Sequence, residues 1–340
     1  MDDEDVSALV LALMALLVAT LPLGWALWIL RVECRRDRVP ILCYHRFLPR
    51  SRAGTDADRE MGWVCYDDEF ERQMEYLAAN GWTTLDLDDY VDIREGRTPA
   101  PARGIIVTMD DGYRSNYELA YPVLKRLGMK AVVYVALEPD LHTRRQVEGI
   151  DGFLSADQLR SLDADGVSIQ SHTLTHSILT ELSDEDVRFE LSESKKRLEE
   201  ILGRPVDHFC FPRGGVDRRV RKLAIEAGYQ TASGANQGTA TALDAAHDLP
   251  RIMMERDMGL AEFRRVLTPL HGALTRIMGR LKGISRRLLG ARGARRLRDL
   301  LHRDFLLPLW RARALRGLIA TGLGLYLVGA VFVARTVFSD

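Results

Sequence analysis

Short apolar runs alternate with amphipathic stretches between about residues 39 and 269. Runs rich in β-branched and aliphatic residues predict buried strands, and apolar residues three or four apart predict helices. The predicted strands cover residues 41–44, 83–85, 104–109, 130–136, 167–170, 209–211 and 249–253, and the predicted helices cover residues 68–80, 115–127, 155–163, 184–202 and 217–227. Strands that alternate with helices are typical of a parallel α/β fold. Seven of them favour a distorted (β/α)7-type barrel over an open sheet.

A long uncharged segment opens the chain. Residues 6–30 hold no charged side chain, and as a helix rising ~1.5 Å per residue they would be long enough to cross a ~30 Å hydrocarbon layer. Four acidic residues precede this segment where a cleavable signal peptide has basic ones, so we predict a retained membrane anchor. Residues 317–334 form a second uncharged run, which predicts a C-terminal membrane helix, with a buried core helix as the alternative.

A basic segment precedes that second run. Residues 276–316 contain 13 basic and 2 acidic residues, and Ile277, Leu281, Ile284 and Leu288 recur at helical spacing. This pattern predicts an amphipathic helix lying on anionic lipid head groups. We expect no nucleic-acid binding, because the run lacks interleaved aromatic residues and borders a membrane segment. The predicted domains are therefore an N-terminal anchor (1–38), a catalytic domain (39–270), a basic helical segment (271–316) and a C-terminal membrane helix (317–340).

Charges beside the two apolar runs predict their orientation. Arginines follow the first run and precede the second, and such residues are retained on the cytoplasmic side; they are Arg31, Arg35, Arg36 and Arg38, then Arg311, Arg313 and Arg316. We therefore predict an integral protein of a bacterial inner membrane whose catalytic domain is cytoplasmic. The four cysteines show no short metal-ligand spacing, which predicts free thiols in a reducing compartment.

Candidate chemistry follows two of the predicted strands. Asp110 and Asp111 come directly after one strand, and His172 and His176 follow another. In a barrel the carboxyl ends of the strands carry the active site, so these four side chains are expected to meet. An Asp-Asp-Gly triplet alone is also a common turn. Two carboxylates with two imidazoles, however, supply both a metal-activated water and a base for it, which predicts a hydrolase.

These segments resemble a known family. The runs Thr108-Met109-Asp110-Asp111-Gly112 and His172-Thr173-Leu174-Thr175-His176 are similar to the first two motifs of polysaccharide deacetylases, the NodB-homology domain of carbohydrate esterase family 4. The resemblance covers roughly residues 39–266. Two further runs, Cys43-Tyr44-His45-Arg46 and Leu249-Pro250-Arg251-Ile252, look most like the subgroup that acts on poly-N-acetylglucosamine. The resemblance implies a distorted barrel, a bound divalent metal, often zinc in this family, and removal of acetyl groups from N-acetylated sugars.

The resemblance also implies roles for individual residues. By motif, Asp111, His172 and His176 would bind the metal and Asp110 would be the general base. The resembled subgroup uses a histidine after the first strand as general acid, which corresponds to His45. His271 is the competing candidate for this acid.

The third motif departs from the family pattern. In the run from Phe209 to Gly215, Arg213 stands where an aromatic residue is common, and the arginine common upstream in other members is missing. Arg213 either replaces that arginine in orienting the base, or binds an anionic group of the substrate, or is a solvated loop residue. Tyr113 and Pro212 are further candidates for binding or orienting the substrate.

The features together predict a membrane-anchored, metal-dependent carbohydrate N-deacetylase. Its expected substrate is a lipid-linked or nascent glycan containing N-acetylhexosamine at the membrane surface, and polysaccharide synthesis machinery is an expected partner. Two alternatives stay open at this point. One is an extracytoplasmic deacetylase of wall or matrix polysaccharide. The other is an inactive glycan-binding subunit of a polysaccharide synthase.

Overall fold

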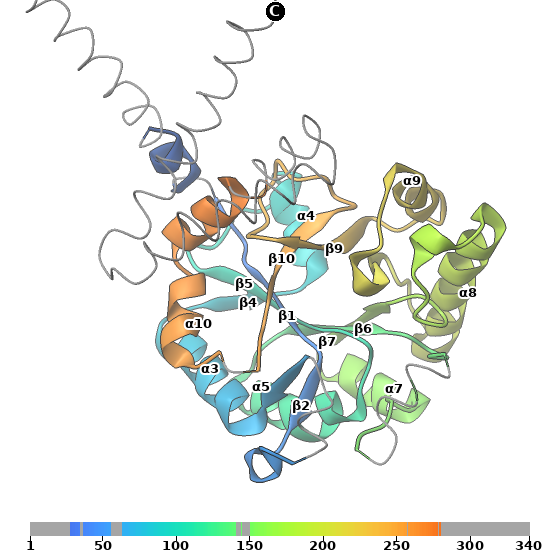
Figure 1. Ribbon diagram of the computed structural model, residues 1–340, viewed down its shortest axis with the longest axis horizontal. Coiled ribbons are helices and arrows are strands. Elements are labelled where there is room, and N and C mark those ends of the chain that lie inside the picture. The colour runs from blue at the N-terminus through green and yellow to red at the C-terminus, as the bar shows by residue number, and fades with distance from the viewer. Residues whose placement is uncertain are drawn as a thin grey trace, which may run out of the picture. The chain divides into compact units, whose positions relative to one another are not determined.

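The computed structural model describes residues 28–34, 37–55, 63–140, 144, 150–256, 258–277 and 279. The chain divides into two compact units, one formed by Asp37–Thr268 and the other by Met1–Arg36 together with Pro269–Asp340. The larger unit carries all the strands described below. In it the strands are central and the helices surround them (Figure 1).

Seven parallel strands close into a barrel. They are β1 (Ile41–Tyr44), β5 (Gly104–Met109), β6 (Ala131–Val135), β7 (Val167–Ser171), β8 (His208–Cys210), β9 (Thr231–Gln237) and β10 (Leu249–Met253). Their order around the ring is β1-β10-β9-β8-β7-β6-β5, and β5 pairs back to β1 with Ile41 opposite Ile106 and Tyr44 opposite Met109. The prediction of a seven-stranded α/β barrel is therefore confirmed.

One member of the barrel differs from the prediction. Residues 83–85 do form a strand, β4 (Thr83–Leu85), but it pairs only with the beginning of β5, and β6 pairs with the end of the same strand. The seventh place belongs to β9, which was not predicted. Its sequence, TASGANQ, has no run of large apolar residues. A side chain at Gly234 would come within 2.7 Å of the Asp248 carboxylate, so this strand is built from small residues to fit a crowded site.

Two short strands lie outside the barrel and were also missed. These are β2 (Arg46–Leu48) and β3 (Val64–Tyr66), which pair in parallel with Arg46 opposite Val64. A three-residue strand is too short to show a period-two pattern. The pair matters for the site because β2 continues the chain immediately after His45.

The helices follow the predicted pattern, with two additions. Those of the larger unit are α3 (Asp67–Ala79), α4 (Leu87–Arg94), α5 (Tyr121–Leu127), α7 (Ala156–Ala164), α8 (Asp184–Leu202), α9 (Arg218–Glu226) and α10 (Leu260–Val266). The bounds of α8 match the prediction, and Gly203 ends it in a left-handed conformation. The short helices α4 and α10 were not predicted. For α4 the missed signal is a capping box between Asp86 and Asp89.

Shorter helical turns complete the larger unit. They are η1 (Arg50–Arg52), the π-helical turn η2 (Asn116–Ala120), η3 (Leu179–Glu181) and η4 (Pro212–Gly214). The predicted helix over residues 115–127 is therefore η2 followed directly by α5.

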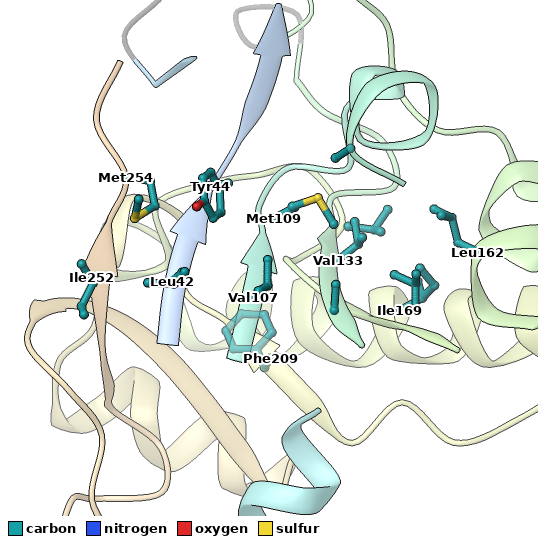
Figure 2. Close-up of a cluster of buried hydrophobic side chains, with 14 of the residues drawn as sticks. Leu42, Tyr44, Val107, Met109, Val133, Leu162, Ile169, Phe209, Ile252 and Met254 are labelled. Atoms are coloured by element: carbon teal, nitrogen blue, oxygen red, sulfur yellow. The ribbon is translucent and has the colours of Figure 1, made fainter. Parts of the chain in front are cut away.

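Alternate residues along the strands face two apolar clusters. One cluster includes Leu42, Val107, Val133 and Ile169 together with residues of α3, α5, α7, α8 and α9, so it lies between the strands and the helices (Figure 2). The opposite strand face includes Ile106, Val132 and Cys210. Thr108 and Asp110 continue the series begun by Ile106, because side chains two apart lie on the same face. The barrel geometry therefore directs Asp110 inward.

The terminal predictions fall largely outside the described residues. This holds for residues 6–27 of the first apolar run, for all of residues 317–334, and for the basic segment apart from residues 276, 277 and 279. Residues 28–34 and 269–277 are helical. In the part of the chain that the structure describes, no helix has the length and apolar character needed to span a bilayer.

Candidate active site

Asp110 and Arg251 form a buried ion pair at the end of β5. Two guanidinium nitrogens of Arg251 each lie 2.7 Å from one carboxylate oxygen of Asp110, and both residues are at most 3% exposed. The third nitrogen of Arg251 donates to the Gly234 carbonyl at 3.2 Å. A bidentate guanidinium fixes both the position and the plane of a carboxylate. The orientation of Asp110 is therefore determined by β10.

The charge of Arg251 keeps Asp110 ionised. Burial by itself would raise the pKa of Asp110, but the adjacent Arg251 outweighs this effect, with a smaller contribution from His45, and lowers the pKa to about 2. Asp110 is consequently a carboxylate at any pH near neutrality. It can accept a hydrogen bond or a proton at once.

Two thiols flank the same carboxylate. The sulfurs of Cys43 and Cys210 lie 3.5 and 3.6 Å from Asp110 Oδ2. Burial is the main reason that the pKa of each thiol is raised well above its usual value. Both cysteines therefore stay protonated and act as weak donors to Asp110. All four cysteines of the chain are free thiols, as predicted.

Asp111 faces the two predicted histidines. Its Oδ1 lies 3.3 Å from His172 Nε2 and 3.1 Å from His176 Nε2. Asp111 adopts a positive φ of 74°, which turns its side chain away from the direction it would take in a continued strand. Gly112 follows with φ 74°, and a Cβ there would lie 3.1 Å from Val135 Cγ1. The turn after β5 therefore brings both adjacent carboxylates to one site.

Hydrogen bonding defines the tautomer of His172. Its Nδ1 lies 2.7 Å from the Cys210 carbonyl oxygen, which can only accept, so Nδ1 carries the proton. The lone pair of a neutral His172 is then on Nε2, the atom that faces Asp111. A backbone carbonyl that fixes the tautomer in this way is typical of metal-binding histidines. Burial raises the pKa of Asp111, but the hydrogen bonds that it accepts from His172 and His176, when their Nε2 atoms carry protons, reverse this and hold the pKa well below the usual value.

Three overlapping groups of side chains have the chemistry to hold a metal ion. Within the described residues they are Cys43-His45-Asp110, Asp110-His172-Cys210 and Asp111-His172-His176, with ligand atoms in each group within 4.8 Å of one another. The first two need a thiolate, which burial disfavours, and both use Asp110, which Arg251 already engages. The third offers one carboxylate and two imidazoles, a set that suits a catalytic divalent ion with open positions. It fits such an ion best.

His45 is a third histidine, close to Asp110. Its Nε2 is 3.9 Å from Asp110 Oδ2, and its ring stacks on Trp63 with the centroids 5.7 Å apart. Burial lowers the pKa of His45, although the carboxylates of Asp110 and Asp111 oppose this shift. A lower pKa makes the protonated imidazole a stronger acid. His45 thus stands where a general acid is needed, and its role as that acid stays a prediction.

Tyr113 packs beside the site in a polar cluster. The guanidinium carbon of Arg46 lies 4.7 Å from the centre of the Tyr113 ring, and Arg46 Nε is 3.4 Å from Asp151. Burial, followed by the negative charge of Asp111, raises the pKa of Tyr113. The Tyr113 hydroxyl therefore keeps its proton, and a hydrogen bond to Asp111 contributes to the same shift.

Arg213 does not orient the base in this structure. It is exposed, has a positive φ of 52°, and forms no hydrogen bond or ion pair with any described residue. Arg251 takes the orienting position instead. Sequence reasoning noted Arg251 only as part of a family-like run, and the signal it missed was an arginine inside an otherwise apolar strand. Pro212 is buried at the start of η4. His271 belongs to the other unit, which contains Pro269–Asp340, and the role of His271 as an acid stays a prediction.

Comparison with known proteins identifies the fold and the family. Residues 97–232 match the sequence model of the family named polysaccharide deacetylase. The chain contains a polysaccharide deacetylase domain. The chain is 29% identical over 196 residues to "Putative polysaccharide deacetylase YxkH" of Bacillus subtilis (strain 168), an alignment that covers 57% of this chain and 67% of that protein. The family resemblance predicted from the motifs is thereby confirmed.

Solved structures share the architecture of the deacetylase domain. BC0361, a polysaccharide deacetylase from Bacillus cereus, is 26% identical with a TM-score of 0.57 and covers 68% of this chain and 69% of its own. The Streptococcus pyogenes deacetylase PplD, solved in complex with acetate, is 21% identical with a TM-score of 0.61 and covers 68% of this chain and 99% of its own. At that identity PplD shows a common fold. The family places this domain among the hydrolases that deacetylate carbohydrates.

Proposed function

We propose that this chain is a metal-dependent N-deacetylase of glycans that contain N-acetylhexosamine. The observation that carries the proposal is the set Asp111, His172 and His176, placed beside an ionised Asp110 that Arg251 orients. This arrangement supplies a ligand set and a separate base within one small volume. It is what hydrolysis of an unreactive amide requires.

Asp111, His172 and His176 would hold the ion, and we propose zinc. A bound divalent ion polarises an amide carbonyl and acidifies water. The side chains of the protein must be in a state that can bind such an ion. Its carboxylate and imidazole ligands must be deprotonated. The low pKa of Asp111 meets that requirement, and in neutral His172 the proton on Nδ1 leaves Nε2 open to an ion.

Proton transfer would involve Asp110 and His45. A water oxygen adds to the acetamide carbon, and Asp110 accepts a proton from that water. The bond between the acetyl carbon and the sugar nitrogen then breaks as protonated His45 donates to the nitrogen, giving acetate and a free amine. The 3.9 Å between Asp110 Oδ2 and His45 Nε2 supports this division of roles, because the two groups are close enough to act on one substrate group.

Substrate contacts are proposed for the residues around this centre. The Tyr113 hydroxyl keeps its proton and could turn from Asp111 to donate to a sugar oxygen, and Pro212, buried at the start of η4, is a second candidate. Arg213 is exposed and without a described partner, so it is free to bind an anionic group of the substrate. The strained φ at Arg213 is consistent with a functional position.

The site of action is proposed from the sequence. The apolar runs at residues 6–30 and 317–334 and the basic segment between them support action on a lipid-linked or nascent glycan at the cytoplasmic face of the membrane, beside polysaccharide synthesis machinery. Labelling with an impermeant thiol reagent in intact cells tests the side. Cys43, Cys65 and Cys210 are too buried to serve, so Leu243→Cys, at a position 77% exposed, is the probe, with Cys34 replaced by Ser. Labelling in intact cells would contradict the cytoplasmic placement.

Acetate release tests the activity. Full-length protein is stripped of metal, reloaded with Zn²⁺ and incubated with N-acetylglucosamine oligomers and lipid-linked acetylated sugars. Asp110→Asn should lower the rate by ~10²- to 10⁴-fold, the usual contribution of a general base. Asp88→Asn is the matched control, because this carboxylate bonds to His208 at the start of β8, away from the reacting centre. Absence of acetate from every acylated sugar with metal-loaded protein would contradict the proposal.

A further inference from the structure

The loop between the two metal-ligand candidates has an unusual backbone. Thr173 and His176 have φ values of 68° and 66°, in the left-handed region that β-branched and bulky residues rarely adopt. Such a conformation is strained and persists only when surrounding contacts impose it. It is also what brings the rings of His172 and His176 within 5.0 Å of one another. The contacts that impose it therefore determine the ligand geometry.

One buried carboxylate supplies three of these contacts. Glu190, on α8 and 6% exposed, accepts hydrogen bonds through Oε2 from the backbone nitrogens of Leu174 and Thr175, both at 2.9 Å. Its Oε1 accepts from the Thr175 hydroxyl at 2.6 Å. Both oxygens are thus committed to the two residues at the centre of the loop. Bonds to an ionised acceptor are roughly twice as strong as neutral ones.

The rest of the loop is held by backbone bonds that do not involve α8. The carbonyls of Leu174 and Thr175 accept from the amides of Glu138 and Asp140 at 2.7 and 3.0 Å. The His176 amide donates to the Thr173 hydroxyl at 2.9 Å. Glu190 is therefore the contact through which a helix, rather than the loop and its neighbouring strand, fixes the residues between the ligands.

We infer that Glu190 is a positioning residue for the metal site. It touches neither the ion nor the substrate, and acts by holding Leu174 and Thr175 so that both imidazoles point at Asp111. The inference rests on the proposed function, because it assumes that His172 and His176 are ligands. Groups that orient metal ligands typically contribute ~10- to 100-fold to metal affinity.

Two substitutions at Glu190 separate shape from hydrogen bonding. In Glu190→Gln the amide oxygen can still accept from both backbone nitrogens, and the amide NH₂ can donate to the Thr175 hydroxyl oxygen. That hydroxyl can then donate to Ser177 Oγ, 2.7 Å away. In Glu190→Ala the two backbone N–H groups lose their acceptor. The Gln variant should therefore rescue most of what the Ala variant loses.

The experiment measures metal binding directly. Full-length variants are titrated with Zn²⁺ against a chromogenic chelator, and the visible absorption of bound Co²⁺ reports the ligand geometry. We expect Glu190→Ala to weaken Zn²⁺ binding ~10- to 100-fold and to alter the Co²⁺ spectrum. Glu190→Gln should lose about fivefold or less, since it gives up only charge assistance. The control is Glu69→Ala, which removes another buried glutamate, one that pairs with Arg72 on α3, and should leave both readouts unchanged.

The outcomes distinguish the inference from the proposed function. If wild-type protein binds no Zn²⁺, the metal-dependent function fails. If wild type binds Zn²⁺ and releases acetate but Glu190→Ala binds it equally well with the same Co²⁺ spectrum, only the role of Glu190 fails. Should the Ala variant not fold, Thr175→Val decides the matter, because it removes the hydroxyl that donates to Glu190. Unchanged affinity in this variant would overturn the inference, and a loss of affinity would support it.

Discussion

Replacing Arg251, whose guanidinium faces Asp110, should reverse the way in which Asp110 makes the stability of the protein depend on pH. Arg251→Met keeps much of the side-chain length but takes away both hydrogen bonds and the charge. In the wild type, Arg251 outweighs burial and the pKa of Asp110 is lowered from 3.8 to about 2, a net shift that contributes about 2.5 kcal/mol to the free energy of unfolding near neutrality. This contribution is present above pH 4 and is lost as the pH falls from about 4 to about 2.

In Arg251→Met the pH dependence of stability has the opposite sign. With Arg251 gone, burial is unopposed by a neighbouring arginine and raises the pKa of Asp110 above its value in the unfolded chain. The folded state then prefers protonated Asp110, so the variant loses stability as the pH rises. Breaking a buried ion pair from one side costs ~3 to 5 kcal/mol when the remaining group stays charged. We expect a loss of this size at pH 8 and a loss smaller by roughly 2 kcal/mol at pH 5.

Urea denaturation at the two pH values measures the effect. Wild type, Arg251→Met, Asp110→Asn and the double variant are compared as full-length proteins in detergent with a chelator present, so that metal binding does not contribute. In the Asp110→Asn background the cost of Arg251→Met should no longer depend on pH. The pairing argument would be refuted if Arg251→Met lowered the free energy of unfolding equally at pH 5 and pH 8. It would also be refuted if that loss were unchanged in the Asp110→Asn background. In the catalytic assay, the acidic limb of the Arg251→Met pH profile should move toward neutrality, because the base is then protonated at higher pH.

Three further outcomes follow from the geometry. His176→Ala should bind Zn²⁺ at least ~10²-fold more weakly in chelator competition and should lose activity that added metal does not restore, whereas an unchanged affinity would exclude it as a ligand. Trp63→Ala should raise KM for glycan oligomers several-fold and change kcat less, because this 48% exposed indole stacks on His45 and offers its ring to a sugar; an effect confined to kcat would contradict substrate contact. Phe70→Ala should lower the free energy of unfolding by ~3 to 5 kcal/mol in urea, since its fully buried ring packs edge-on against Tyr44 and Phe47, and a loss under about 1 kcal/mol would show that the core collapses around it.

Sequence reasoning succeeded where local pattern and fold geometry agree. The apolar run of β5 and the 3.6-residue period of α8 predict the same bounds that the structure shows. It failed for β9, because that strand is made of small and polar residues whose burial comes from neighbouring strands. Periodicity identifies buried positions only where the buried residues are themselves apolar.

The candidate site divides in the same way. Asp110, Asp111, His172 and His176 were predicted because they follow strands whose ends must meet in a barrel, and the structure brings them together. Arg251 could not be assigned to Asp110 from sequence, since 141 positions separate them along the chain. The same holds for Glu190, which looks like an ordinary charged residue of an amphipathic helix.

The fold class, the family and the residue types that meet at the strand ends can be predicted from the chain alone, because these depend on periodicity and on motifs within a few residues. Three features become visible only in the folded protein: the arginine that holds the base, the histidine nitrogen that is free to bind a metal, and the carboxylate that holds the loop between the ligands. These features depend on distances of 2.6 to 2.9 Å between side chains from different strands and helices. Closing the barrel sets such distances, and no local pattern encodes them.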